Sequence, residues 1–195
     1  MSSTKKNSET RQKFDYYRTP VDQIVLFLGE FEKEIPLAID QICILDPCAG
    51  GDYNNPMSYP EALQQHFGAK LTTNLVTVDI REDSRADIIE DYLQHEVDYE
   101  PDLIITNPPF SLAQPILTKA LSDVKDGGWV VMLLRLNFFG SVGRKVFFDK
   151  YMPVYTFVHR KRMSFTPDGQ TDSIEYMHAV FQKRNNPDFT RLKII

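Results

Sequence analysis

The chain has 195 residues, of which 42% are hydrophobic and 25% are charged, and its formal net charge at pH 7 is −5. This length and composition predict one soluble globular domain with a substantial core. The acidic balance argues against a protein that coats nucleic acid with its whole surface, although it allows a local basic patch. No apolar stretch reaches the length of a transmembrane helix, and the N-terminus is polar rather than signal-like, so we expect no membrane partner.

The cysteines and histidines form no pattern of a disulfide framework or a metal site. The two cysteines, Cys43 and Cys48, lie close together in the sequence, and the four histidines are scattered. We therefore expect reduced thiols in a cytosolic protein and no bound metal.

The chain begins with a polar segment over 1–13, which predicts a flexible tail before a single domain over 14–195. After three aromatic residues, Thr19 and Pro20 have the pattern of a helix N-cap and a first helical residue, and the helix is expected to end near Phe31. The same stretch, from Tyr17 to Thr19, is also suited to form one wall of a ligand pocket. The sequence leaves both interpretations open.

A buried strand is predicted over 42–45, because this apolar run has no helical period. It ends in Asp46-Pro47-Cys48-Ala49-Gly50-Gly51, where small residues let a bulky ligand approach the backbone. A glycine pair also occurs in ordinary turns, so this segment alone does not distinguish a nucleotide-binding loop from a turn.

Two more strands are predicted in the next part of the chain. A helix over 60–67 leads to a strand over 74–78, which ends at Asp79, where a carboxylate can accept hydrogen bonds from ribose hydroxyls. A short strand over 86–89 is followed by Glu90-Asp91-Tyr92-Leu93.

The most informative segment is a strand predicted over 102–106 and the four residues after it, Asn107-Pro108-Pro109-Phe110. Proline cannot donate to a sheet ladder and restricts the residue before it, so the prolines stop the strand in a rigid turn. The amide of Asn107 and the ring of Phe110 are then held at the carboxyl end of a strand, where open α/β sheets bind ligands. An ordinary turn explains the tetrapeptide alone equally well.

The remaining elements complete an α/β pattern. Helices are predicted over 114–121 and 142–150, with a buried strand over 129–134 between them, and strands over 154–158 and 176–181 form a terminal hairpin. Five strands that alternate with helices up to residue 150, and the two strands of the hairpin, predict a doubly wound, mostly parallel seven-stranded sheet with helices on both faces and a C-terminal antiparallel hairpin.

Together these landmarks, from about Phe14 to Lys183, resemble the class I S-adenosylmethionine-dependent amino-methyltransferases, which have a Rossmann-like fold. The resemblance is closest to the small phage-type DNA N6-adenine methyltransferases. It implies S-adenosylmethionine as the cofactor, adenine-containing DNA as the partner, and a bacterial or phage-infected host cytoplasm as the location.

The resemblance also implies which residues bind the cofactor. An N-terminal motif would contact the methionine end, the glycine-rich loop would pass beneath the cofactor, an acid with its neighbour would bind the ribose, and a second acid would hold the adenine amino group. In that order, these residues are Tyr17, Thr19 and Pro20; Asp46, Pro47, Cys48, Ala49 and Gly50; Asp79 and Ile80; Asp91 and Tyr92.

The resemblance identifies Asn107, Pro108, Pro109 and Phe110 as the catalytic motif, with Asn107 also beside the cofactor. The side-chain carbonyl of Asn107 and the backbone carbonyl of Pro108 would accept the two hydrogens of an adenine amine. Phe110 would stack on a base taken out of the helix.

A late segment, Met163-Ser164-Phe165 with Asp168-Gly169, resembles the family motif that helps to hold the flipped base, although a core phenylalanine explains Phe165 equally well. The basic run Arg160-Lys161-Arg162 is the best candidate for phosphate contacts. A solvated surface run also explains it, and we prefer that explanation for Arg144 and Lys145.

The sequence departs from the family pattern in two places. The usual Gly-x-Gly is here Gly50-Gly51-Asp52, and we expect no separate target-recognition domain after the hairpin. Target reading would then come from loops such as 57–60 and 160–172, come from a second subunit, or be slight. Three alternatives stay open: an RNA adenine-N6 methyltransferase, a protein glutamine-N5 methyltransferase, and a catalytically inactive methyltransferase-like binding subunit.

Overall fold

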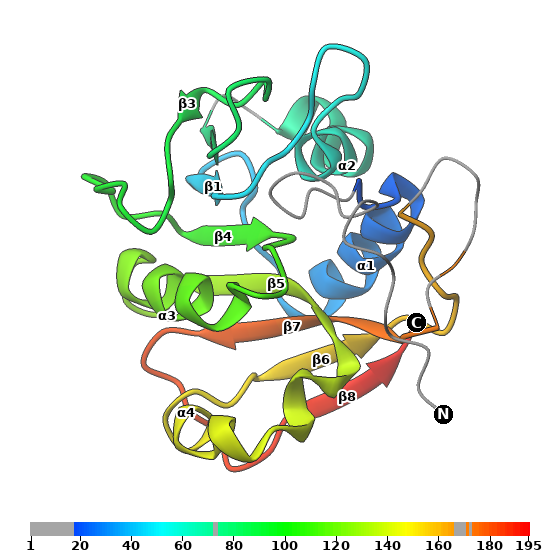
Figure 1. Cartoon of the computed structure of the whole chain (residues 1–195), viewed down its shortest axis with the longest axis vertical. Coiled ribbons are helices and arrows are strands. Elements are labelled where there is room, and N and C mark those ends of the chain that lie inside the picture. Colours follow the sequence, from blue (N-terminus) through cyan, green and yellow to red (C-terminus); the bar gives the residue numbers. More distant parts are fainter. Residues whose placement is uncertain (1–17, 72–73, 166–170, 172) are drawn as a thin grey trace.

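A computed structural model describes residues 18–71, 74–165, 171 and 173–195 of the chain. The predicted tail, Tyr17 and Asp168-Gly169 lie outside the described residues. The centre of the fold is an eight-stranded sheet with the strand order β3-β2-β1-β4-β5-β7-β6-β8 (Figure 1). The strands are β1 Ile44–Asp46, β2 Leu75–Asp79, β3 Ile88–Ile89, β4 Leu103–Thr106, β5 Trp129–Arg135, β6 Tyr155–Val158, β7 Tyr176–Gln182 and β8 Arg191–Ile194.

Helices cover both faces of the sheet, as predicted. They are α1 Val21–Glu34, α2 Ser58–Phe67, α3 Ala113–Asp123 and α4 Lys145–Lys150, with 3-10 turns at Gly68–Lys70, Leu136–Gly140 and Val142–Arg144. Alternate residues of a strand face opposite sides of a sheet. Accordingly Leu45 and Ile104 pack with α3 and α4, whereas Ile44, Leu103 and Ile105 pack with α1 and α2. The mostly parallel α/β prediction is therefore confirmed.

The sheet has one strand more than predicted. The five strands from β3 to β5 are parallel, and β7 is antiparallel to both β5 and β6, as the predicted hairpin requires. The additional strand, β8, pairs in parallel with β6 at the edge of the sheet. Its four residues are all exposed and alternate between charged and apolar, so they lack the buried apolar run by which the other strands were predicted.

The strand order reverses at β1, and this reversal positions the site. The chain proceeds from β1 outward to β2 and β3, then returns to the other side of β1 to form β4 and β5. In open α/β sheets a crevice opens at such a point, outside the carboxyl ends of the strands. Asp46, Asp79 and Asn107 stand at the ends of β1, β2 and β4, so all three lie at this crevice.

Two negative findings apply to the described ranges. No helix within them combines the length and apolarity that a membrane crossing needs. No group of three or more His, Cys, Asp and Glu side chains in the same ranges is arranged to hold a metal ion. Cys43 and Cys48 are both free thiols.

Candidate active site

A pocket at the crevice brings together most of the residues predicted to bind the cofactor. The predicted residues that line it are Thr19, Pro47, Cys48, Ala49, Asp79, Ile80, Asp91, Tyr92, Asn107 and Pro109. Pro20, Asp46 and Gly50 are adjacent in sequence to lining residues but do not line it themselves. Segments from five parts of the chain therefore meet where the strand order predicts a ligand site.

Sequence reasoning missed five further lining residues: Ser58, Tyr59, Arg81, Leu112 and Ile116. Ser58 and Tyr59 are the first two residues of α2, which begins two residues earlier than predicted. Leu112 and Ile116 belong to the start of α3 and carry only an apolar helical pattern, which is the usual signal of a core position.

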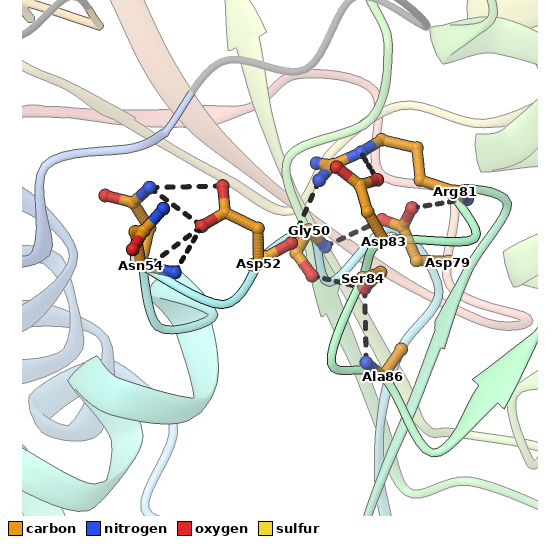
Figure 2. Close-up of polar contacts among 10 residues, drawn as sticks. Gly50, Asp52, Asn54, Asp79, Arg81, Asp83, Ser84 and Ala86 are labelled. Carbon is orange, nitrogen blue, oxygen red and sulfur yellow. Dashed lines mark hydrogen bonds and ion pairs between the residues drawn. The ribbon is translucent and has the colours of Figure 1, made fainter.

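The carboxylate of Asp79 holds the glycine-rich loop in place (Figure 2). Its Oδ2 accepts a hydrogen bond from the Gly50 N–H at 2.7 Å, and its Oδ1 accepts one from the Arg81 N–H at 2.9 Å. Arg81 Nη2 donates to the Gly51 carbonyl at 3.0 Å, and the Ser84 hydroxyl donates to the Gly50 carbonyl. The loop after β2 thus fixes both glycines from one side.

The backbone of this loop requires glycine. Gly50 and Gly51 have φ values of 65° and 73°, in the left-handed region that other residues rarely adopt. A Cβ atom on Gly51 would lie 2.7 Å from the Cγ of Met57, which is a steric clash. The adjacent glycines therefore form a tight loop, and not merely a flexible turn.

Asp52 stands where the family pattern has its second glycine, and its side chain forms a turn with the residues that follow it. Its Oδ1 accepts hydrogen bonds from the backbone N–H groups of Asn54 at 2.8 Å and Asn55 at 2.9 Å. This arrangement is a local side-chain turn of the kind that Asp favours. The departure from Gly-x-Gly therefore leads into an ordered turn before α2.

Asn107 is oriented by a residue far away in the sequence. Its Nδ2 donates to the Thr19 hydroxyl at 2.9 Å, across 88 residues of chain, and Thr19 is only 2% exposed. The Oδ1 of Asn107 is buried and has no hydrogen-bond partner within the described part of the chain. A buried amide oxygen without a partner is costly, so this atom is suited to accept a hydrogen bond from a ligand.

The predicted N-cap role of Thr19 is wrong. Pro20 occupies the cap position of α1, which has no side-chain cap, and the Pro20 carbonyl accepts hydrogen bonds from the N–H groups of Gln23 and Ile24. The hydroxyl of Thr19 bonds to Asn107 instead. Of the two open interpretations of this segment, the structure favours the pocket wall.

Asp46 lies beneath the glycine-rich loop and is fully buried. Its pKa is raised to about 7, mainly by burial and also by the nearby charge of Asp79, although the Thr106 hydroxyl and the Cys48 N–H act to lower it. Its Oδ1 accepts a hydrogen bond from the Cys48 N–H at 3.2 Å. Asp46 therefore stabilises the glycine-rich loop through this hydrogen bond to its backbone.

The raised pKa of Asp46 predicts a pH-dependent loss of stability. A carboxyl group whose pKa rises from 3.8 to about 7 on folding binds more protons in the folded state between these values, so its contribution to the free energy of unfolding falls as the pH rises through this range. Relative to Asp46→Asn, the wild type should lose on the order of a few kcal/mol of stability between pH 4 and pH 7. Urea unfolding of both proteins at several pH values measures this difference. A difference that does not change with pH would contradict the prediction.

A buried hydrogen-bonded chain supports the pocket-lining Tyr59. The Tyr59 hydroxyl lies 2.9 Å from His178 Nε2, and His178 Nδ1 lies 2.7 Å from His159 Nε2. Burial lowers the pKa of His159 to about 4 and lowers that of His178 as well, so both imidazoles are neutral at pH 7. The chain links α2 to β7 and to the end of β6.

Aromatic side chains gather on the other side of Asn107. The rings of Phe110 and Phe165 lie 5.7 and 4.9 Å from the ring of Tyr176, measured between centroids. The guanidinium carbon of Arg135 lies 4.5 Å from the centre of the Phe110 ring. The structure thus brings the two predicted base-stacking residues into one cluster around Tyr176, which sequence reasoning missed.

The predicted phosphate-contacting run lies on the surface. Arg160, Lys161 and Arg162 are all exposed. Lys161 pairs with Asp22 at 3.5 Å and Arg162 pairs with Glu175 at 3.3 Å. Exposed ion pairs contribute little stability, so these pairs leave the run able to bind phosphate.

Arg144 and Lys145 have local partners, in keeping with the surface role preferred for them. The guanidinium of Arg144 stacks over the Phe138 ring at 4.2 Å and donates to the Phe138 carbonyl, and Lys145 pairs with Asp149 at 2.7 Å.

Comparison with known proteins identifies the fold. No protein-family model and no curated protein matches the chain. Among solved structures, a proposed class I S-adenosylmethionine-dependent methyltransferase from Listeria monocytogenes matches 96% of this chain and 68% of its own length, with a TM-score of 0.68 and 13% identity. A proposed RNA methyltransferase from Pyrococcus horikoshii matches 89% of each chain, with a TM-score of 0.59 and 15% identity.

A chain of the DrdV–DNA complex matches 97% of this chain but only 28% of its own length, with a TM-score of 0.61 and 14% identity. At these identities the matches establish the fold alone. The chain has the Rossmann-like fold of the class I methyltransferases.

Proposed function

We propose that the protein is an S-adenosylmethionine-dependent methyltransferase that acts on the N6 amine of adenine in DNA. The observation that carries this proposal is the amide of Asn107. It stands at the carboxyl end of β4 and is held by Thr19 on its nitrogen side, and its buried oxygen has no hydrogen-bond partner among the residues that the structure describes. An amine that enters the pocket would supply the missing hydrogen bond.

The pocket suits the cofactor that the fold implies. Asp79 and Asp91 provide carboxylates for ribose hydroxyls and for a purine amino group, and the side chains of Ile80, Tyr92 and Ile116 offer apolar surface to a purine ring. Asp79 already accepts two backbone hydrogen bonds, but a carboxylate has about four acceptor sites and can accept more. When bound, S-adenosylmethionine supplies a methyl group on a positively charged sulfur, which a nitrogen lone pair can displace.

The residues of this chain would activate the amine by hydrogen bonding and position. The lone pair of an adenine amine is delocalised into the ring, which makes the nitrogen a poor nucleophile. If Asn107 Oδ1 and the Pro108 carbonyl accept its two hydrogens, the nitrogen is drawn toward a tetrahedral geometry and its lone pair becomes available. The displaced proton then leaves to solvent, so the residues need only to position the amine.

Three observations support DNA as the polymer. Phe110 lies three residues after Asn107, in an aromatic cluster that can stack on a flipped base. The exposed run Arg160-Lys161-Arg162 follows β6, and one of the matched folds belongs to a complex with DNA. Residues 58–60 of the predicted target-reading loop belong to α2, so target reading would come from the segment that begins at Arg160, or from a second subunit.

Thr19 offers a direct test of the amide's orientation. Thr19→Val keeps the shape of the side chain but removes the acceptor of the Asn107 hydrogen bond. We expect methyl transfer to fall about fivefold, as the loss of one hydrogen bond of about 1 kcal/mol predicts. Thr19→Ser, which restores the hydroxyl, should recover most of the rate. Single-turnover assays compare the three proteins, and equal rates for the valine variant and the wild type would contradict the orienting role.

The decisive experiment identifies the acceptor. The protein is incubated with labelled methyl donor and, in parallel, with single-stranded DNA, duplex DNA, RNA and protein, and the products are hydrolysed and analysed. We expect N6-methyl-2′-deoxyadenosine. Label only in RNA or only in protein would overturn the DNA assignment, and cofactor binding without transfer to any acceptor would indicate an inactive binding subunit.

A further inference from the structure

Arg135 is a cation placed at the acceptor side of the site. It is the last residue of β5, half-exposed, and lies opposite Tyr176 in the antiparallel pairing of β5 with β7. Its guanidinium carbon lies 4.5 Å from the centre of the Phe110 ring. One arginine thus contacts the ring that ends the Asn107-Pro108-Pro109-Phe110 motif.

Arg135 and the arginine that lines the cofactor pocket have different surroundings. The chain carries a net charge of −5, and Arg81, the one cation among the described residues that line the cofactor pocket, has its guanidinium on the Gly51 carbonyl and on Asp83. Arg81 is therefore engaged with the glycine-rich loop. Arg135, in contrast, contacts the aromatic cluster around Tyr176, through the ring of Phe110.

A flipped nucleotide carries negatively charged phosphates as well as a base. A base that stacks on Phe110 is linked through its sugar to backbone phosphates, and those phosphates come near the side chains around the same ring. The planar guanidinium of arginine suits both tasks at such a place, because it stacks on an aromatic face and donates two parallel hydrogen bonds to a phosphate. A glutamine side chain in a protein would bring no such charge.

Resting on the function proposed above, we propose that Arg135 binds a backbone phosphate adjacent to the flipped adenosine. The acceptor is then a nucleotide within a polynucleotide chain, and not an amide in a protein. Arg135 contributes to acceptor affinity and leaves cofactor affinity unchanged.

The chain offers a matched control in Arg144. Its guanidinium carbon also stacks on a phenylalanine, Phe138, at 4.2 Å, and Arg144 is half-exposed as well. It belongs neither to the pocket lining nor to the cluster around Tyr176. Arg144→Met therefore removes one charge and one stacking contact of the same kind at a different place.

The test compares the wild type with Arg135→Met, Arg135→Lys and Arg144→Met on an oligonucleotide that the wild type methylates and that carries one methylatable adenosine. Affinity is measured by fluorescence anisotropy over a range of salt concentrations, and cofactor affinity by calorimetry. Two further oligonucleotides each carry one neutral methylphosphonate linkage, one on the 5′ side and the other on the 3′ side of this adenosine, so that the phosphate charge is removed from the substrate instead of the protein.

We expect Arg135→Met to weaken oligonucleotide binding about tenfold and to reduce the salt slope by about 0.7 to 0.9, the value for one phosphate contact. Arg135→Lys should be intermediate, and Arg144→Met should match the wild type. One of the two neutral linkages should weaken the wild type about tenfold but add little to the loss in Arg135→Met.

Several results would overturn the inference. The first is an Arg135→Met variant with the oligonucleotide affinity and salt slope of the wild type. The second is an equal loss of oligonucleotide affinity in Arg144→Met. The third is a loss of affinity from the neutral linkages that is as large in Arg135→Met as in the wild type. If Arg135→Met does not fold, the test depends on the oligonucleotide affinity of Arg135→Lys and on the affinity of the wild type for the oligonucleotides with neutral linkages. Failure of the proposed function is distinct, because the wild type would then methylate no nucleic acid at all.

Discussion

Replacing Asn107 by alanine is expected to reduce methyl transfer by roughly 100- to 1,000-fold, the usual effect of removing one preorganised hydrogen-bonding group from an active site. The variant loses the buried oxygen that would accept a hydrogen of the amine, and it leaves the Thr19 hydroxyl without its present partner. Cofactor affinity should change little, because the loops after β1 and β2 remain intact. Single-turnover assays and calorimetry measure the two effects separately.

Asn137 provides the control for this prediction. It is an exposed asparagine two residues beyond the end of β5, the strand next to β4 in the sheet. Asn137→Ala should retain the wild-type rate. Full activity in Asn107→Ala would remove Asn107 from the catalytic motif.

Replacing Asp79 by alanine is expected to weaken S-adenosylmethionine binding by at least about tenfold. The variant loses a candidate ribose acceptor and also releases the N–H groups of Gly50 and Arg81. Asp79 is only 7% exposed, so each unsatisfied group should cost about 1–3 kcal/mol of stability. Calorimetry measures the affinity and urea unfolding measures the stability.

Asp83→Ala separates the two consequences of the Asp79 change. The Asp83 carboxylate binds the Nε of Arg81 from an exposed position, so its removal disturbs the same loop without opening the hydrogen bonds to Gly50. We expect nearly wild-type cofactor affinity in this variant. Unchanged affinity in Asp79→Ala would place Asp79 outside the cofactor site.

The parts of the fold that could be predicted from the sequence are those with a strong local pattern. Buried parallel strands such as β4 and β5 are continuous apolar runs, and the residues at their carboxyl ends follow directly from where those runs stop. The edge strand β8 has no such run, because Arg191 to Ile194 pair with only one neighbour and all remain exposed. Its place depends on a partner strand more than 30 residues away.

The site residues that could be predicted are those whose polar side chain directly follows a recognisable strand. Asp79 and Asn107 are polar residues at strand ends, and both line the pocket. The orienting contact of Thr19 could not be predicted, since a threonine before a proline has the local pattern of a helix cap, and only the fold brings its hydroxyl to Asn107. Tyr176 was missed for a similar reason, because a buried tyrosine at the start of β7 has the pattern of a core residue.

The last residue of the chain ends beside the basic run. The Ile195 N–H donates to the Val158 carbonyl, the Ile195 carbonyl accepts from the Arg160 N–H, and the Ile195 side chain is only 9% exposed. Any segment that continues past Ile195, natural or added, therefore starts next to Arg160-Lys161-Arg162. An affinity tag for purification is best attached at the other end of the chain, because a C-terminal tag would begin beside the surface that we expect to meet DNA.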